Sequence, residues 1–100
     1  DQSFSFNGGG NHVRIPASPS LNVGSGSGLT IGAWVKPATS AQQPILEWAP
    51  GGGMYGTLLW LSVQSAGSVY ADLVDSSGNL HLIQTAGGMI TNHGFQHIAV

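Results

Sequence analysis

Glycine and proline interrupt this chain so often that a long helix has no room to form. The 100 residues include 16 glycines and 5 prolines, and no window of about 11 residues keeps the apolar spacing of an amphipathic helix. Between the interruptions lie short runs rich in β-branched and aromatic residues, bounded by clusters of Gly, Ser, Asn and Pro. This pattern predicts an all-β domain.

The predicted strands are short, and one of them alternates clearly. In residues 29–36 the apolar Leu29, Ile31, Ala33 and Val35 occupy every second position, so one face of this strand should be buried. Residues 75–79 have the Asp, Ser and Gly content of a hairpin turn, and residues 16–23 favour a tight or 3₁₀ turn. The full set of predicted strands is 2–7, 12–15, 29–36, 44–48, 55–63, 68–74, 80–85 and 95–100.

Composition excludes several classes of function. Only 6% of the residues are charged, and Arg14 and Lys36 are the only cations, so the chain has no basic patch with which to bind nucleic acid. The longest apolar run covers residues 58–61, far below the roughly 18–20 residues that a membrane-spanning helix needs. Without cysteine, the chain has no disulfide, no thiolate zinc site and no thiol nucleophile.

A family resemblance extends over nearly the whole chain, and it is carried by an ordered series of segments. The most specific are Thr30-Ile31-Gly32-Ala33-Trp34-Val35-Lys36-Pro37 and the later His97-Ile98-Ala99-Val100. They are preceded or separated by Ser5-Phe6-Asn7-Gly8, His12-Val13-Arg14-Ile15-Pro16, Ser18-Pro19-Ser20-Leu21-Asn22 and Gln43-Pro44-Ile45-Leu46. The chain resembles the N-terminal portion of a laminin-G-like jelly roll of the concanavalin A-like lectin/glucanase superfamily.

The resemblance implies one domain over residues 1–100, an antiparallel β-sandwich of the jelly-roll type. It also implies a secreted or cell-surface module that binds glycans or surface proteins, often with calcium. Relatives continue through further strands beyond the one that contains His97, whereas this sequence stops at Val100. We therefore expect an incomplete sandwich that is completed in trans, as a homo-oligomer or assembly. The alternative is that the 100 residues are a piece of something longer.

The sequence contains few residues that could bind a metal ion. Asn7 and Asn11 stand where relatives often have Asp, which makes them weak calcium candidates, because amide oxygens bring no charge to the site. The preferred interpretation is that they support a glycine turn, and we predict no cofactor. His93 and His97 are four residues apart, which places them about 13 Å apart on a strand, too far to share an ion. We expect His97 to be a packed structural residue; His12 and His81 have no visible partner in the sequence.

The acidic residues are too sparse for the catalytic pattern of the related glucanases. Glu47 is the only glutamate, and its predicted strand holds no second acid. Asp72 and Asp75 are three residues apart, which places them on opposite faces of a strand, and Asp75 falls in the predicted turn. We therefore interpret these as exposed strand and turn residues and expect no enzyme activity. A pair formed in space by Glu47 and Asp72 remains an open alternative.

Aromatic residues supply the best binding candidates. Trp48 and Tyr55 flank the segment 49–54, with Glu47 adjacent; sugars stack on aromatic rings and bond to nearby polar groups. We therefore name Glu47, Trp48 and Tyr55 as candidate ligand-binding residues, although packing explains the two aromatics equally well. Trp34 and Trp60 lie in mid-strand, and we expect them in the core. The sequence thus predicts a non-catalytic binding or adhesion module, with a self-assembling structural subunit as the alternative.

Overall fold

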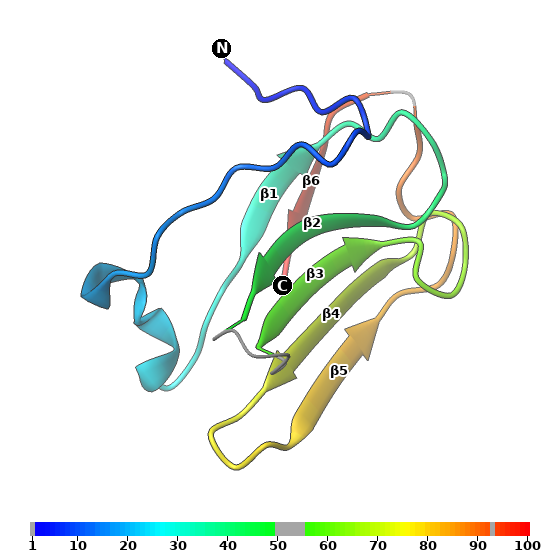
Figure 1. The fold of residues 1–100 in the computed structure, drawn as a ribbon. Helices are drawn as coiled ribbons and strands as arrows, with labels where there is room; N and C mark the ends of the chain where they lie inside the picture. The colour runs from blue at the N-terminus through cyan, green and yellow to red at the C-terminus, as the bar shows by residue number, and fades with distance from the viewer. Residues whose placement is uncertain (1, 50–55, 93) are drawn as a thin grey trace.

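The chain folds into two antiparallel sheets with almost no helix (Figure 1). The computed structural model describes residues 2–49, 56–92 and 94–100. In the smaller sheet, β1 pairs with β6; the larger sheet has the order β2-β3-β4-β5. The elements are the 3₁₀ turns η1 (Pro19–Leu21) and η2 (Val23–Ser25) and the strands β1 (Gly32–Val35), β2 (Gln43–Trp48), β3 (Thr57–Leu61), β4 (Val69–Val74), β5 (Leu80–Gln84) and β6 (Gln96–Ala99). The all-β prediction is confirmed.

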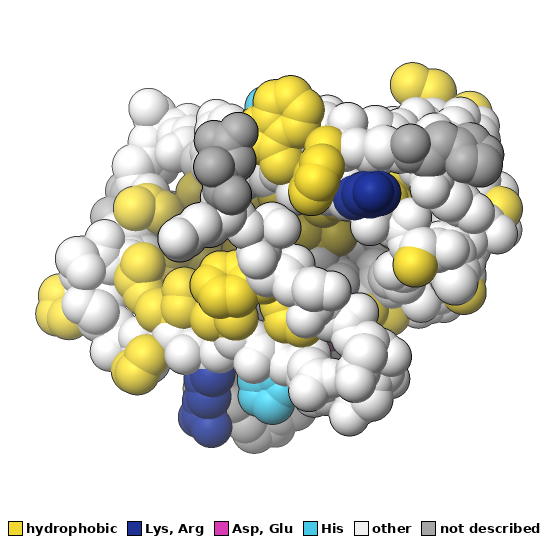
Figure 2. Space-filling model, turned by 90° about the horizontal axis from the view of Figure 1, so that it is seen from above, with side chains coloured by type: hydrophobic (Ala, Val, Ile, Leu, Met, Phe, Trp, Pro, Cys, Tyr) yellow, Lys and Arg dark blue, Asp and Glu magenta, His cyan; other side chains and the backbone are white. Residues whose placement is uncertain are grey.

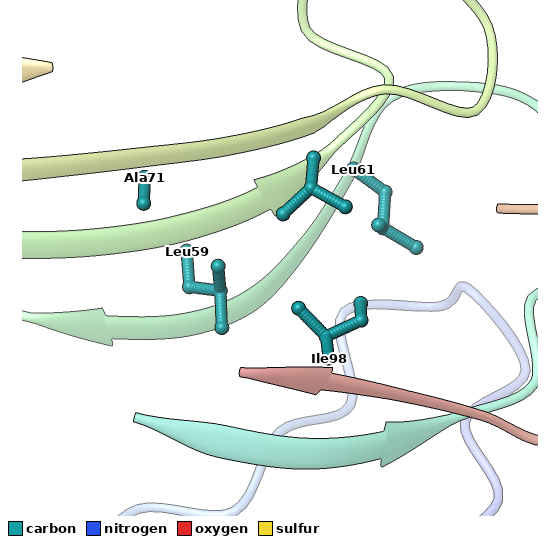
Figure 3. Close-up of a cluster of buried hydrophobic side chains, with 5 residues drawn as sticks. Leu59, Leu61, Ala71 and Ile98 are labelled. Carbon is teal, nitrogen blue, oxygen red and sulfur yellow. The ribbon is translucent and has the colours of Figure 1, made fainter. Parts of the chain in front are cut away.

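The core lies between the two sheets. Figure 3 shows Leu59, Leu61 and Ala71 of the larger sheet projecting toward Ile98 of β6; Val69 completes this buried cluster. From β1, Ile31 and Val35 pack against the cluster, as the alternation in residues 29–36 predicts. Because side chains alternate along a strand, the core residues also identify the opposite, outward-facing side of each sheet.

Trp34 belongs to the outward-facing side, and its expected core position is wrong. It pairs with His97 of β6 and is 69% exposed, because the same alternation that buries Ala33 and Val35 turns it toward solvent. Trp60 also lies on an outward face, that of the larger sheet, but it is partly buried there, and its indole nitrogen is fully buried.

The first two predicted strands, 2–7 and 12–15, are not strands in the structure. Both segments are exposed coil, and the chain runs through them outside the two sheets (Figure 1). Between them Gly8 and Gly10 adopt positive φ angles of 79° and 80°, which breaks the extended backbone that a strand needs. Apolar composition alone was a misleading signal here, because a strand forms only where another strand bonds to it.

The predicted turns are confirmed. Ser18 caps η1 by accepting a hydrogen bond from the Ser20 amide. At the β4–β5 hairpin, Asp75 Oδ1 accepts from the amides of Ser77 and Asn79, both at 2.9 Å, and Gly78 supplies the positive φ angle of 84°. The turn therefore depends on the Asp75 carboxylate.

Hydrogen bonds to that carboxylate hold the pKa of Asp75 well below its usual range. The largest contribution comes from the Asn79 side chain, whose Nδ2 donates to Oδ2 at 3.0 Å, followed by His81 at 3.1 Å and then by the backbone amides. A lowered folded-state pKa means that the ionised carboxylate stabilises the fold above the unfolded-state pKa, which is about 3.9. This stabilisation is lost as the pH falls below that value.

We predict that Asp75→Ala lowers the melting temperature near neutral pH and also flattens its dependence on acid. Between about pH 6 and about pH 2.5, the melting temperature of the unmodified chain should fall further than that of Asp75→Ala. Thermal melts followed by circular dichroism measure both slopes, with Ser76→Ala in the same turn as the control. Equal slopes for the unmodified chain and Asp75→Ala would contradict the role of this carboxylate.

Candidate functional site

Of the three candidate ligand-binding residues, the two that the structure describes, Glu47 and Trp48, do not share a face. Glu47 pairs with Leu58 and Trp48 with Thr57, so the two side chains point to opposite faces of β2. Glu47 is exposed on the outer face, and Trp48, which is 40% exposed, lies at the rim of the inner face. Tyr55 lies outside the described residues. The structure therefore presents Trp48 and Glu47 as neighbours along the edge strand β2, not as two walls of one pocket.

Glu47 and Asp72 share the outer face of the larger sheet but are two strands apart. Glu47 pairs with Leu58, which pairs with Asp72 of β4, and strands lie about 4.8 Å apart. Their backbone positions are therefore about 9–10 Å apart, well beyond the roughly 5 Å between the carboxyls of a retaining glycosidase. The sequence left a catalytic pair of Glu47 and Asp72 as an open alternative. The distance between the two residues does not fit a retaining glycosidase.

Asp72 is buried, so its expected exposure is wrong. Only 4% of it is exposed, and the hydroxyl of Tyr70 donates to its Oδ2 at 3.4 Å. Burial raises the pKa of Tyr70, and the charge of Asp72 and this hydrogen bond raise it further. Within the described residues, Asp72 Oδ1 and the indole nitrogen of Trp60 have no hydrogen-bond partner. The group is closed to a ligand from outside and is a polar part of the packed sheet.

Two of the histidines have partners that the sequence did not reveal. His81 bonds to Asp75 across the β4–β5 hairpin at 3.1 Å, and His12 lies 3.2 Å from the Gly10 carbonyl oxygen. His97 is exposed, with its ring 5.2 Å from that of Trp34, so its expected packed position is wrong. His93, which is four residues before His97 in the sequence, lies outside the described residues.

The glycine-turn interpretation of Asn7 is confirmed, because its Oδ1 accepts a hydrogen bond from the Gly9 amide at 3.0 Å. The side-chain oxygen of Asn11 lies near the same glycine. A Cβ atom added to Gly9 would be 3.8 Å from this oxygen. Among the described residues, no three His, Asp or Glu side chains lie close enough to hold a metal ion.

A hollow of about 520 Å³ lies between β6 and the β4–β5 half of the larger sheet. Its lining is mainly apolar and includes Ala71, Ile83, Met89, Ile90 and Ile98. Figure 2 shows that hydrophobic side chains also gather on the face of the molecule seen from above, with no acidic side chain in view. The two-stranded sheet is too narrow to cover all of its four-stranded partner.

Backbone hydrogen bonds show which groups β6 leaves unpaired. Ile31 and Val100 exchange both of their backbone bonds, at 2.9 and 3.0 Å, and in an antiparallel ladder such bonded pairs alternate. Ile98 therefore bonds to β1, while the N–H and C=O groups of His97 and Ala99 point the other way. Among the described residues no strand pairs with β6 on that side.

In the part of the chain that the structure describes, the larger sheet has a similar free edge at β5. Thr85 N donates to Val69 O and Asp75 N donates to Asn79 O, both at 3.0 Å. By the same alternation, His81 and Ile83 bond to β4, and the backbone groups of Leu80, Leu82 and Gln84 point away from the sheet. The open side of the sandwich is thus bordered by β5 and β6, and both strands have unpaired backbone donors and acceptors.

Sequence reasoning predicted β5 but missed its exposed edge. The usable signal is that apolar residues occupy consecutive positions, Leu82 and Ile83, so they must face both sides of the sheet. That composition is typical of a strand covered on both faces, whereas here Leu82 faces outward and Ile83 faces the hollow, and both are exposed.

Comparison with known proteins finds no match: no family model, no curated protein and no solved structure is significantly similar to this chain. Within the described residues, the structure has no helix of the length and apolar character needed to cross a membrane.

Proposed function

We propose that this chain is a laminin-G-like, jelly-roll-type module that acts by binding and not by catalysis, as a secreted or cell-surface protein. Its ligand on this proposal is a glycan or a surface protein. The observation that carries it is the indole of Trp48, which is 40% exposed at the end of the edge strand β2. An accessible aromatic ring is a surface on which a sugar can stack.

Catalysis is the weaker alternative for this chemistry. The described acids are Glu47, which is exposed on the outer face, Asp72, which is buried and accepts a hydrogen bond from Tyr70, and Asp75, which is bonded within the turn. A glycoside hydrolase of the usual kind needs two carboxyls that both reach the substrate, and the burial of Asp72 leaves Glu47 without such a partner in the described part of the chain.

We predict that Trp48→Ala weakens glycan binding by at least about tenfold, since an aromatic anchor dominates the affinity of a small site. A glycan array identifies the ligands of the unmodified chain, and isothermal titration with the best of them measures the change. Trp34→Ala, which removes an exposed indole from the other sheet, is the matched control and should bind normally. Absence of binding to every glycan, or equal binding by Trp48→Ala, would contradict the proposal.

A second candidate function is that of a structural subunit whose sheets are completed by neighbouring chains. The apolar hollow between β6 and β4–β5, with a free strand edge on each sheet, favours it, because water-exposed apolar hollows and bare edges promote association.

We predict that the folded chain associates as its concentration rises. Sedimentation velocity over a hundredfold range from low micromolar concentration should show growth of a dimer or larger species, with circular dichroism to verify folding. A folded monomer over the whole range would contradict the second candidate.

A further inference from the structure

We propose that β5 pairs antiparallel with β5 of a second copy of this chain, with Leu82 on the twofold axis. The inference rests on the second candidate function and names the strand, the partner and the register through which association occurs. It is carried by two observations: the composition of the edge and the direction of its backbone groups.

The two edge strands of the larger sheet differ sharply. β2 carries Pro44, a register shift between Pro44 and Leu46, and the charged Glu47. Proline, bulges and charges are the features that keep sheet edges from pairing with other chains. β2 is therefore a protected edge.

β5 has none of these features. Its register with β4 is regular over all five residues, Leu80 to Gln84. It contains no proline and no Asp, Glu, Lys or Arg, and its three large apolar side chains are exposed: Leu80 by 57%, Leu82 by 48% and Ile83 by 60%. An unprotected apolar edge on the same sheet as a protected one marks β5 as the pairing edge.

The unpaired backbone groups determine what can cover this edge. The N–H and C=O groups of Leu80, Leu82 and Gln84 point outward, at every second position, so the complementary partner is another extended strand. A second β5 fits without electrostatic repulsion, because neither edge carries a formal charge apart from His81, which lies on the inner face and bonds to Asp75.

The register in which Leu82 lies on the axis is the one that pairs all three outward-bonding residues of β5. Leu82 is its central residue and an outward-bonding one, so two antiparallel copies can place Leu82 opposite Leu82 as a hydrogen-bonded pair. Leu80 then lies opposite Gln84 of the second copy, and their backbone groups also bond. The resulting interface is isologous and closes as a dimer. The two four-stranded sheets become one continuous sheet of eight strands.

The twofold axis is perpendicular to the joined sheet, so both inner faces lie on the same side. The two hollows next to Ile83 therefore adjoin across the axis, and on the outer face the Leu82 side chains contact each other. Pairing thus covers exposed apolar surface on both faces of β5 as well as its backbone edge.

Single cysteines test the register directly, because the natural chain has none. The Cα atoms of a hydrogen-bonded antiparallel pair are about 5.5 Å apart, within the range of a disulfide. Leu82→Cys should therefore form a cross-linked dimer under mild oxidation, visible on a non-reducing gel. Leu80→Cys is the matched control; its two copies would be about 13 Å apart and should stay uncross-linked, whereas a mixture with Gln84→Cys should cross-link.

Failure of Leu82→Cys to cross-link, or equal cross-linking by Leu80→Cys, would overturn the proposal. Leu82→Lys is the second variant, chosen because Leu82 is half exposed and a lysine there should leave the fold intact, as circular dichroism would verify. It places like charges on the axis, and sedimentation velocity should show a monomer at concentrations where the unmodified chain is a dimer.

The outcomes also separate this inference from the second candidate function. Association that persists in Leu82→Lys would overturn the β5 pairing while leaving assembly through another surface, such as the free edge of β6. A folded monomer of the unmodified chain would overturn both.

Discussion

The packing of Ile98 against Leu59 and Leu61 is the contact on which the rest of the structure depends. Ile98 is the buried core residue that the smaller sheet contributes, and it meets the buried leucines of β3 (Figure 3). Through this contact the sheets become layers of one sandwich, and it sets which side of each strand faces solvent. Removing large apolar side chains from such a site typically costs about 2–5 kcal/mol, a large share of the stability of a small domain.

The same contact explains why the sandwich is open. Two strands cannot cover four, so the small sheet shields β3 and the adjoining half of β4 and leaves Ile83 of β5 exposed on the inner face. A chain with 6% charged residues has few charged side chains with which to cover the remainder. Both proposed functions use this surface of aromatic and aliphatic side chains, one to bind neutral sugars and the other to bind another copy of the chain.

Local sequence patterns predicted those parts of the fold that depend on local interactions. All six strands of the structure lie within or overlap predicted runs, and the Asp75 turn forms because one carboxylate bonds to its own backbone nearby. The failures concern contacts between distant segments. Residues 2–7 have strand composition but no strand beside them, and Asp72 is buried by packing that periodicity does not encode. Trp34 is exposed because its place in the strand alternation, and not its aromatic character, determines which face it occupies.

The candidate site shows the same division. Sequence reasoning brought Glu47 and Trp48 together as neighbours, but their opposite orientations follow from the strand that β2 forms with β3. The edge of β5 was hidden because exposure depends on which strands are absent from its side, a property of the whole sandwich. Its outward-pointing groups could be identified only from the β4–β5 ladder.

Amide hydrogen exchange resolved by residue tests the central claim, that β5 is an edge completed by a second copy. The amides of His81 and Ile83 bond to β4 and should be protected at every concentration at which the chain is folded. The amides of Leu80, Leu82 and Gln84 should exchange rapidly in dilute solution and become protected as the concentration rises. Rapid exchange of these three amides at all concentrations, in a chain whose His81 and Ile83 remain protected, would contradict the account.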